Sequence, residues 1–200
     1  MNFNFKVANT KLEGEWSSVI NKLNKCVFFE CNDYDLKNAI TGIAIKSETG
    51  NIKDLLRSKE SEIPEDYSLT ILYNHPTIKK LVDFFQIETT RIRIFKQNPG
   101  SNTKLHLDYN NTWTKNKKDF LIRIWMALNY DKNFVYIFKE GKSPVTNIKL
   151  RAGESVVFNP DTVYHGAFNN SNKVRYSLHI IGKPNTWLKN FIKEERTYIL

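Results

Sequence analysis

Hydrophobic and polar residues alternate along the second half of the chain in the pattern of β-strands. From about residue 89, apolar runs recur at intervals of roughly ten residues and are separated by turn sequences such as NPG and EGK. The runs are RIRIFK, KLHLDY, FLIRIWMALNY, FVYIFKE, NIKL, RAGE, SVVFN and VRYSLHII. Segments of this length and spacing predict an antiparallel jelly roll, which buries most sheet edges and leaves a mouth for a ligand.

Helical patterns flank these strands. Residues 11–25 carry apolar side chains spaced as on one face of a helix, namely Leu12, Trp16, Val19, Ile20 and Leu23. A second helix is expected over 76–86, because Pro76 suits the first helical position and an apolar face follows it. After Gly182, a turn leads into a third helix that Asn185 or Thr186 can cap. Residues 26–73 predict short strands and irregular loops.

The length of 200 residues suits one domain. We expect a mainly β fold with flanking helices, a cupin-like double-stranded β-helix, over residues 1–200. Its parts would be a mixed α/β support at 1–89, the jelly-roll core at 90–182 and a C-terminal helix at 183–200.

The strand FLIRIWMAL has two different faces. One face is wholly apolar and predicts packing on the helices, with Phe120, Ile122, Ile124, Met126 and Leu128. The other face should point into the pocket, with Leu121, Arg123, Trp125 and Ala127. Because an unpaired buried charge is costly, the guanidinium of Arg123 needs an anionic partner, which a bound carboxylate would supply.

The strand VRYSLHII places a polar stripe inside an apolar segment, because Arg175, Ser177 and His179 share one face. Arg175 either reaches a ligand or makes a salt bridge within the protein. For His179 we expect a hydrogen bond within the protein.

Composition narrows the classes of partner. A net charge of +9 would suit binding to nucleic acid, but the lysines are scattered along the sequence. The one tight basic run, KNKK at 115–118, has no interleaved aromatic residues and predicts a solvated loop. The cysteines, Cys26 and Cys31, have neither zinc-site nor disulfide-scaffold spacing and predict buried, reduced thiols. Without a secretory h-region or a long apolar run, we expect a cytoplasmic protein with no membrane partner.

The histidines suggest a metal site. His106 and Asp108 stand two residues apart in KLHLDY, so on a strand they would point to the same face and grip one ion. His165 in VYHGAF would complete two imidazoles and one carboxylate, the facial set that holds non-haem Fe(II) and leaves coordination positions open. Open positions indicate chemistry at the metal, so these residues predict a metal-dependent oxygenase.

Residues 91–181 resemble a known family. The order PG, HLD, RIW, GESVVFN, HG, N and RYS is similar to that of the aspartyl/asparaginyl β-hydroxylase and proline hydroxylase group of Fe(II)/2-oxoglutarate oxygenases. The resemblance implies that His106, Asp108 and His165 bind iron. It also implies that 2-oxoglutarate chelates the metal while Arg175 holds its far carboxylate and Ser177 adds a hydroxyl donor. Hydroxylation with O₂ as cosubstrate would yield succinate and CO₂.

The chain departs from this family's pattern in places. Arg123 matches the arginine of the R-x-H strand, which helps to bind an acidic group, but Trp125 stands where the histidine would be. Two positions make the chain resemble the branch that hydroxylates free proline or related amino acids. It keeps the carboxylate ligand, Asp108, and it has Phe95 at a position that is polar in the protein-aspartate enzymes. Asn159 and Asn169 would brace turns near the mouth.

Two other functions remain open at this stage. One is a cupin-type metal enzyme that uses no 2-oxoglutarate, which would need no anchor such as Arg175. The other is a nonenzymatic binding barrel whose basic face contacts nucleic acid. The expected substrate is a small molecule, such as an amino acid, or a side chain in a peptide.

Overall fold

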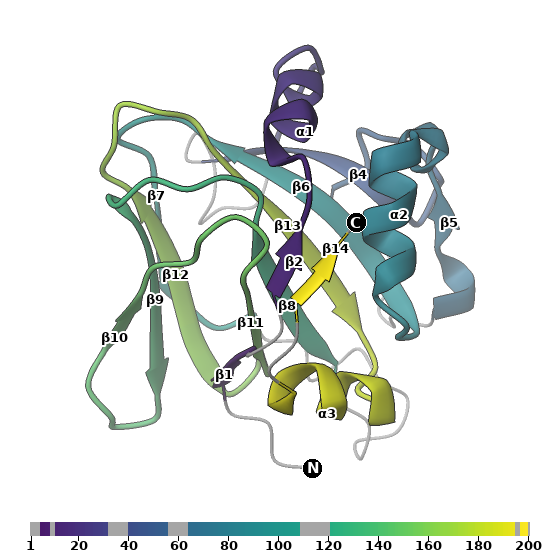
Figure 1. Cartoon of the computed structure of the whole chain (residues 1–200). Helices are drawn as coiled ribbons and strands as arrows, with labels where there is room; N and C mark the ends of the chain where they lie inside the picture. The colour runs from purple at the N-terminus through teal and green to yellow at the C-terminus, as the bar shows by residue number, and fades with distance from the viewer. Residues whose placement is uncertain are drawn as a thin grey trace.

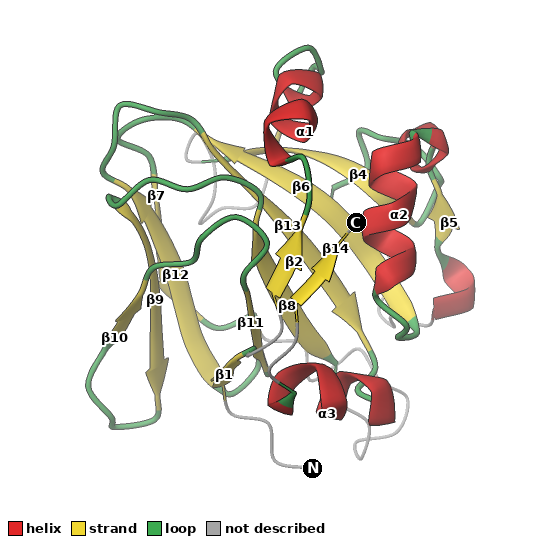
Figure 2. Cartoon of the chain, in the orientation of Figure 1, coloured by secondary structure: helices red, strands yellow, loops and turns green. Residues whose placement is uncertain are grey.

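The computed structural model describes residues 5–8, 11–31, 40–55, 64–108, 121–194 and 197–199. A large and a small antiparallel sheet lie face to face, and helices pack on the outer side of the large sheet (Figures 1 and 2). This is the predicted jelly-roll arrangement, and strands from the second half of the chain contribute to both sheets.

The large sheet has the strand order β1-β11-β8-β13-β6-β4-β3, with β5 paired to β4. The bounds are β1 (Phe5–Val7), β11 (Ser155–Phe158), β8 (Ile122–Ala127), β13 (Arg175–Gly182), β6 (Thr89–Gln97), β4 (Thr41–Ser47), β3 (Phe29–Glu30) and β5 (Ser68–Leu69). The small sheet has the order β10-β9-β12-β7, with β10 (Thr146–Ile148), β9 (Phe134–Glu140), β12 (Val163–Asn169) and β7 (Asn102–His106). A parallel pair joins β2 (Lys11–Glu13) to β14 (Thr197–Ile199).

The helices are α1 (Trp16–Leu23), α2 (Pro76–Phe84) and α3 (Thr186–Lys193), with 3-10 turns η1 (Pro64–Asp66) and η2 (Ile71–Asn74). The helix expected over 11–25 was too long, because Leu12 lies in β2, where its backbone N–H donates to Gly153 O at 3.0 Å. Pro76 opens α2 as predicted, although α2 ends at residue 84. The side chain of Asn185 caps α3 by accepting from the N–H of Leu188, and β14 then follows. No described helix is long and apolar enough to cross a membrane.

The large sheet separates two apolar layers. Its outer face packs on the helices through Ile122, Ile124, Met126 and Leu128, as the alternation predicted. On its inner face, Trp125 and Ala127 pack against aromatic residues of the small sheet, including Phe138. Phe120 and the run KNKK at 115–118 lie outside the described residues. Cys26 and Cys31 are free thiols, the first half-buried and the second buried.

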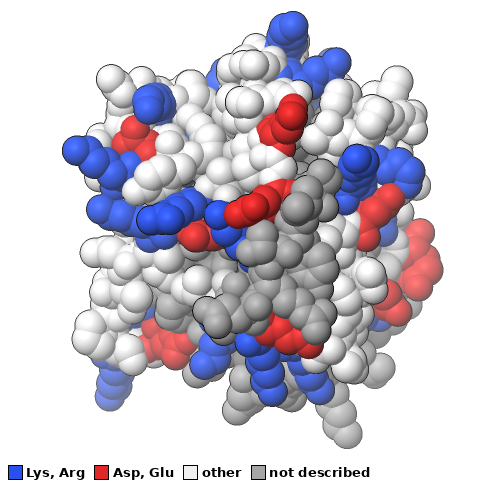
Figure 3. Space-filling model, in the orientation of Figure 1, with Lys and Arg blue, Asp and Glu red and all other residues white. Residues whose placement is uncertain are grey.

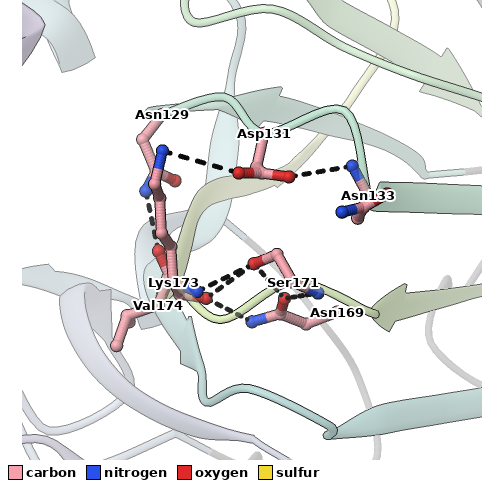
Figure 4. A network of polar contacts seen from close by, with 7 residues as sticks. All are labelled: Asn129, Asp131, Asn133, Asn169, Ser171, Lys173 and Val174. Atoms are coloured by element: carbon pink, nitrogen blue, oxygen red, sulfur yellow. Dashed lines mark hydrogen bonds and ion pairs between the residues drawn. The ribbon is translucent and has the colours of Figure 1, made fainter.

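A polar network links the loop between β8 and β9 to the loop between β12 and β13, as Figure 4 shows. The fully buried amide of Asn169 donates to Gln97 O at 2.9 Å and to Lys173 O at 2.8 Å, and its oxygen accepts from the hydroxyl of Ser171 at 2.8 Å. Asn129 donates to Val174 O at 2.7 Å in the same network. These bonds fix the turn from β12 into β13 and therefore the position where β13 begins. The expectation that Asn169 braces a turn is confirmed.

Asn169→Ala should lower the free energy of unfolding by about 1 to 3 kcal/mol, because it removes the donor that the buried amide gives to Gln97 O and one of the two donors of Lys173 O. Chemical denaturation of the two purified proteins measures this difference. Asn170→Ala is the matched control, since the neighbouring Asn170 is exposed and should lose less than about 0.5 kcal/mol. Equal losses in the two variants would contradict the bracing role of Asn169.

Candidate metal centre

His106, Asp108 and His165 converge on one point between the sheets. One ligand atom from each of them lies within 4.8 Å of the others. Oδ1 of Asp108 is 3.5 Å from Nε2 of His106 and 3.5 Å from Nε2 of His165. The two histidines are directly paired across β7 and β12. Asp108 lies just beyond the end of β7, where its backbone N–H donates to Pro160 O at 3.0 Å. The sequence prediction that these groups meet is confirmed.

Both imidazoles are held with the same nitrogen facing the cluster. Nδ1 of His106 lies 2.7 Å from Lys104 O, and Nδ1 of His165 lies 2.9 Å from Val163 O. Because a carbonyl oxygen can only accept, each Nδ1 carries the proton. Each Nε2 therefore presents its lone pair toward Asp108, which is the arrangement that a metal ion requires of histidine.

Gly166 lets β7 approach β12 closely beside the cluster. A Cβ at this position would lie 2.7 Å from Thr103 O and 2.9 Å from Lys104 O, both of which are backbone atoms of β7. The pairing of the two strands also shifts register between His165 and Ala167. The small residue after His165 is thus what allows the strand that carries His106 to come within ligand distance.

The charge states of the cluster suit a cation. Burial opposes ionisation of Asp108, but the charge of Arg123 and the two imidazoles hold the pKa of that carboxyl well below its usual range. Burial lowers the pKa of His165, which keeps it neutral. Burial also disfavours protonation of His106, but its hydrogen bonds to Asp108 and Lys104 O outweigh this, and its pKa is raised. A metal ion binds only the unprotonated imidazole, so protons compete with it for His106 and its affinity should fall as the pH drops.

Arg123 faces inward from β8, as predicted. Its guanidinium forms an ion pair with Oδ2 of Asp108, and its Nη1 lies 3.4 Å from Nε2 of His165. The anionic partner that its buried position requires is therefore Asp108 itself. This contact ties one carboxylate oxygen and leaves the other, Oδ1, facing the two histidines.

A second cluster of polar atoms surrounds Arg175, which is 3% exposed. Its guanidinium lies over the ring of Tyr136 at 4.6 Å, and its Nη1 is 3.4 Å from both Val135 O and Phe168 O. Within the described part of the chain, no carboxylate is ion-paired with Arg175, and neither its Nε nor the hydroxyl of Tyr136 has a hydrogen-bond partner. These atoms give the salt-bridge alternative no support.

Tyr136 is a candidate site residue that sequence reasoning missed. The signal was available, because the alternation in FVYIFKE puts Phe134, Tyr136 and Phe138 on one face, and β9 pairs with β12 next to His165. Tyr136 lies between two phenylalanines on this face, so its hydroxyl is a polar group that points into the barrel.

Three further side chains of the large sheet lie between the candidate metal site and Arg175. They are Trp125, Ser177 and His179. Trp125 stacks on His179 with ring centroids 4.7 Å apart and meets the edge of His165 at 5.3 Å. The hydroxyl of Ser177 is 3.0 Å from Nε2 of His179, which confirms the expected internal hydrogen bond of that histidine. Trp125 Nε1 is buried and forms no hydrogen bond among the described residues.

Comparison with known proteins gives structural likenesses only. No protein-family model matches the sequence, and no curated protein matches it. The fold is similar to that of an oxidoreductase of the 2OG-Fe(II) oxygenase family from Burkholderia pseudomallei, with a TM-score of 0.58 and 14% identity over 84% of this chain and 78% of that one. It is also similar to a prolyl hydroxylase from Trichoplax adhaerens in complex with a hypoxia-inducible factor peptide fragment, with a TM-score of 0.56 and 14% identity over 91% of this chain and 84% of that one.

At this level of identity the comparisons establish the fold. The chain has the double-stranded β-helix that 2OG-Fe(II) oxygenases, prolyl hydroxylases among them, also have. Its activity must be argued from the side chains at the site.

Proposed function

We propose that this protein is an Fe(II)- and 2-oxoglutarate-dependent dioxygenase that hydroxylates an amino acid or an amino-acid side chain of a peptide. The observation that carries the proposal is the convergence of His106, Asp108 and His165 inside a double-stranded β-helix. In this proposal residues 1–200 form one oxygenase domain that works in the cytoplasm and belongs with the proline and aspartyl/asparaginyl hydroxylases.

The donor set fits ferrous iron. Two neutral imidazoles and one carboxylate form a facial set with open positions, and both Nε2 atoms already point at Oδ1 of Asp108. Fe(II) and 2-oxoglutarate together would supply the oxidising chemistry that hydroxylates a C–H bond, with succinate and CO₂ as co-products.

The residues around Arg175 fit 2-oxoglutarate. Most buried polar atoms in folded proteins have a hydrogen-bond partner, so several unpaired donors close together point to a ligand that brings acceptors. Nε of Arg175, the hydroxyl of Tyr136 and Nε1 of Trp125 are such atoms in the described chain. A guanidinium holds a carboxylate in angle as well as position, so Arg175 would hold the far carboxylate, with Tyr136 as a second donor.

The protein would also exclude water from the reacting centre. The rings of Phe158 and Trp125 lie 4.8 Å and 5.3 Å from the ring of His165, which is itself fully buried. Apolar walls of this kind strengthen the electrostatic contacts made inside the site.

Arg175→Ala should weaken 2-oxoglutarate binding by roughly ten- to a hundredfold, because a hydrogen-bonded charge pair contributes on the order of 1.5 to 3 kcal/mol. Calorimetric titration of the anaerobic Fe(II)-loaded protein measures the change. Arg151→Ala provides the control, since Arg151 is exposed on the turn before β11 and should leave the affinity unchanged. If the Arg175 variant bound 2-oxoglutarate as tightly as the wild type, the anchor assignment would be wrong.

The substrate can be found by a turnover screen. Amino acids and short acidic peptides are incubated with the protein, Fe(II), 2-oxoglutarate and O₂, and mass spectrometry detects the product with one added oxygen atom. The retained Asp108 and the buried Phe95 support free amino acids within this range. Iron binding without any 2-oxoglutarate turnover would instead favour a cupin-type metal enzyme.

The surface charge supports a small-molecule or peptide substrate over nucleic acid. The net charge is +9, but Figure 3 shows the Lys and Arg side chains of one face in several groups with acidic and uncharged atoms between them. Nucleic-acid binding through phosphate contacts normally needs basic side chains gathered on one stripe or face.

A further inference from the structure

His179 is a buried histidine that neither the metal cluster nor the Arg175 anchor uses. It lies on the inner face of β13, where its cross-strand partners are Trp125 on β8 and Arg93 on β6. The side chain is 6% exposed, stacks on Trp125 and meets the edge of Phe95 with centroids 4.6 Å apart. Its ring is thus fixed on both sides by aromatic contacts.

One nitrogen of this ring is satisfied and the other is not. Nε2 lies 3.0 Å from the hydroxyl of Ser177, whereas Nδ1 is buried and has no hydrogen-bond partner among the described residues. Burial, and then the charges of Arg123, Arg93 and Arg175, hold the pKa of His179 well below its usual range, so the ring is neutral. A neutral imidazole has one donor and one acceptor nitrogen. In the tautomer whose Nε2 accepts from the Ser177 hydroxyl, Nδ1 carries the proton and can donate it to a ligand.

A fixed positive charge lies beside this donor. Arg93 is 5% exposed, its Nη1 donates to Leu55 O at 2.8 Å, and its guanidinium lies over the ring of Phe95 at 5.0 Å. Because Arg93 is directly opposite His179 in the pairing of β6 with β13, the two side chains share the inner face. A neutral donor next to an arginine favours an anionic oxygen as its partner.

This position is separate from the Arg175 anchor. The two residues are four apart on β13, which corresponds to about 13 Å along a strand. Arg175 also reaches toward Val135 O and Phe168 O of the small sheet, whereas His179 lies among residues of the large sheet. One carboxylate cannot bridge the two, so Nδ1 of His179 addresses a different group from the one that Arg175 holds.

We propose that His179 and Arg93 form a second carboxylate position, which takes the carboxylate of the primary substrate. The inference rests on the proposed oxygenase function and narrows its substrate to a carboxylate-bearing molecule, with a free amino acid as the simplest case. His179 is then a specificity-determining residue that binds the substrate through Nδ1–H and is itself held by Ser177.

The first test observes the ring directly. The chain has four histidines, so ¹⁵N spectra of the imidazoles can be assigned by single substitutions. The full-length chain is loaded with Zn²⁺, which is diamagnetic and takes imidazole and carboxylate ligands. It is saturated with 2-oxoglutarate and titrated with L-proline, L-aspartate and acetate, each compared with its uncharged carboxamide. At least one acid should move the Nδ1 signal of His179 while its amide does not. Equal responses to acid and amide, or none to any acid, would overturn the proposal.

Two substitutions separate the nitrogens of the ring. The amide of His179→Asn can occupy the place of Nδ1, whereas that of His179→Gln reaches the place of Nε2 and Ser177. His179→Gln should weaken binding of the responding acid by about ten- to a hundredfold, and His179→Asn by about tenfold less than that. Both should bind 2-oxoglutarate within about twofold of the wild type. Loss of 2-oxoglutarate affinity comparable to that of Arg175→Ala would place His179 in the cosubstrate site and refute a second position.

Different results would contradict the oxygenase function and the second carboxylate position. If the wild type neither binds 2-oxoglutarate nor forms succinate, the oxygenase proposal fails, yet the acid-against-amide titration of the full-length chain can still be read. If 2-oxoglutarate binds and turns over but amides work as well as acids, only the second carboxylate position is refuted.

Discussion

His106→Ala is expected to abolish ferrous-ion binding and, with it, succinate formation from 2-oxoglutarate. The substitution removes one of the three groups whose ligand atoms lie within 4.8 Å of each other. Since loss of a residue that only orients a ligand typically costs 10- to 100-fold in metal affinity, loss of the ligand itself should cost more than about a hundredfold. Anaerobic Fe(II) titration measures the affinity, and Asp108→Ala should behave in the same way.

The fold should survive this change, because His106 is only half-buried and ends its strand. His75→Ala is the matched control, since His75 precedes α2 and takes no part in the metal cluster. It should bind iron as the wild type does. Wild-type affinity or full turnover in His106→Ala would refute the assignment of the ligands and leave the oxygenase proposal without its central support.

Gly166→Ala is expected to damage both stability and metal binding. The added methyl group would lie 2.7 Å and 2.9 Å from two backbone oxygens of β7, so the strand must move. Overpacking of this kind typically costs about 1 to 3 kcal/mol of folding free energy. Because β7 carries His106, the movement should also separate the two imidazoles and lower Fe(II) affinity by at least about tenfold. Thermal unfolding and anaerobic titration measure the two effects.

A control for Gly166 lies in the turn between β9 and β10. Gly141 has φ +49°, and a methyl group added there would meet no described atom within 4 Å. Gly141→Ala should therefore cost about 1 kcal/mol through the left-handed backbone alone and leave metal affinity unchanged. If Gly166→Ala kept wild-type iron affinity, the close approach of β7 and β12 would not be what sets the ligand geometry.

Local patterns predicted much of the second half of the chain. Alternation placed Trp125 and Ala127 on the inner face of β8, and the spacing of His106 and Asp108 indicated a shared site with His165. These features depend on neighbouring residues of one strand, whose geometry repeats every two positions. The approach of β12 that brings in His165 followed from the resemblance to a family and from the choice of ligand types.

Other features depend on contacts that local patterns do not contain. The boundary between β2 and α1 was missed because Leu12 has the spacing of the helix but pairs with a turn far along the chain, at Gly153. The addition of β4 and β1 to the large sheet, and the pairing of β14 with β2, are likewise long-range. The ion pair of Arg123 with Asp108 was not foreseen, since alternation gives the direction of a side chain but not its partner across the barrel.

That ion pair has a consequence for how the protein matures. A buried carboxylate with no cation beside it would penalise the folded state until iron arrived, as happens in small domains that fold only around their metal. Here Arg123 already balances Asp108. The folded state therefore needs no bound metal ion to balance the charge of Asp108.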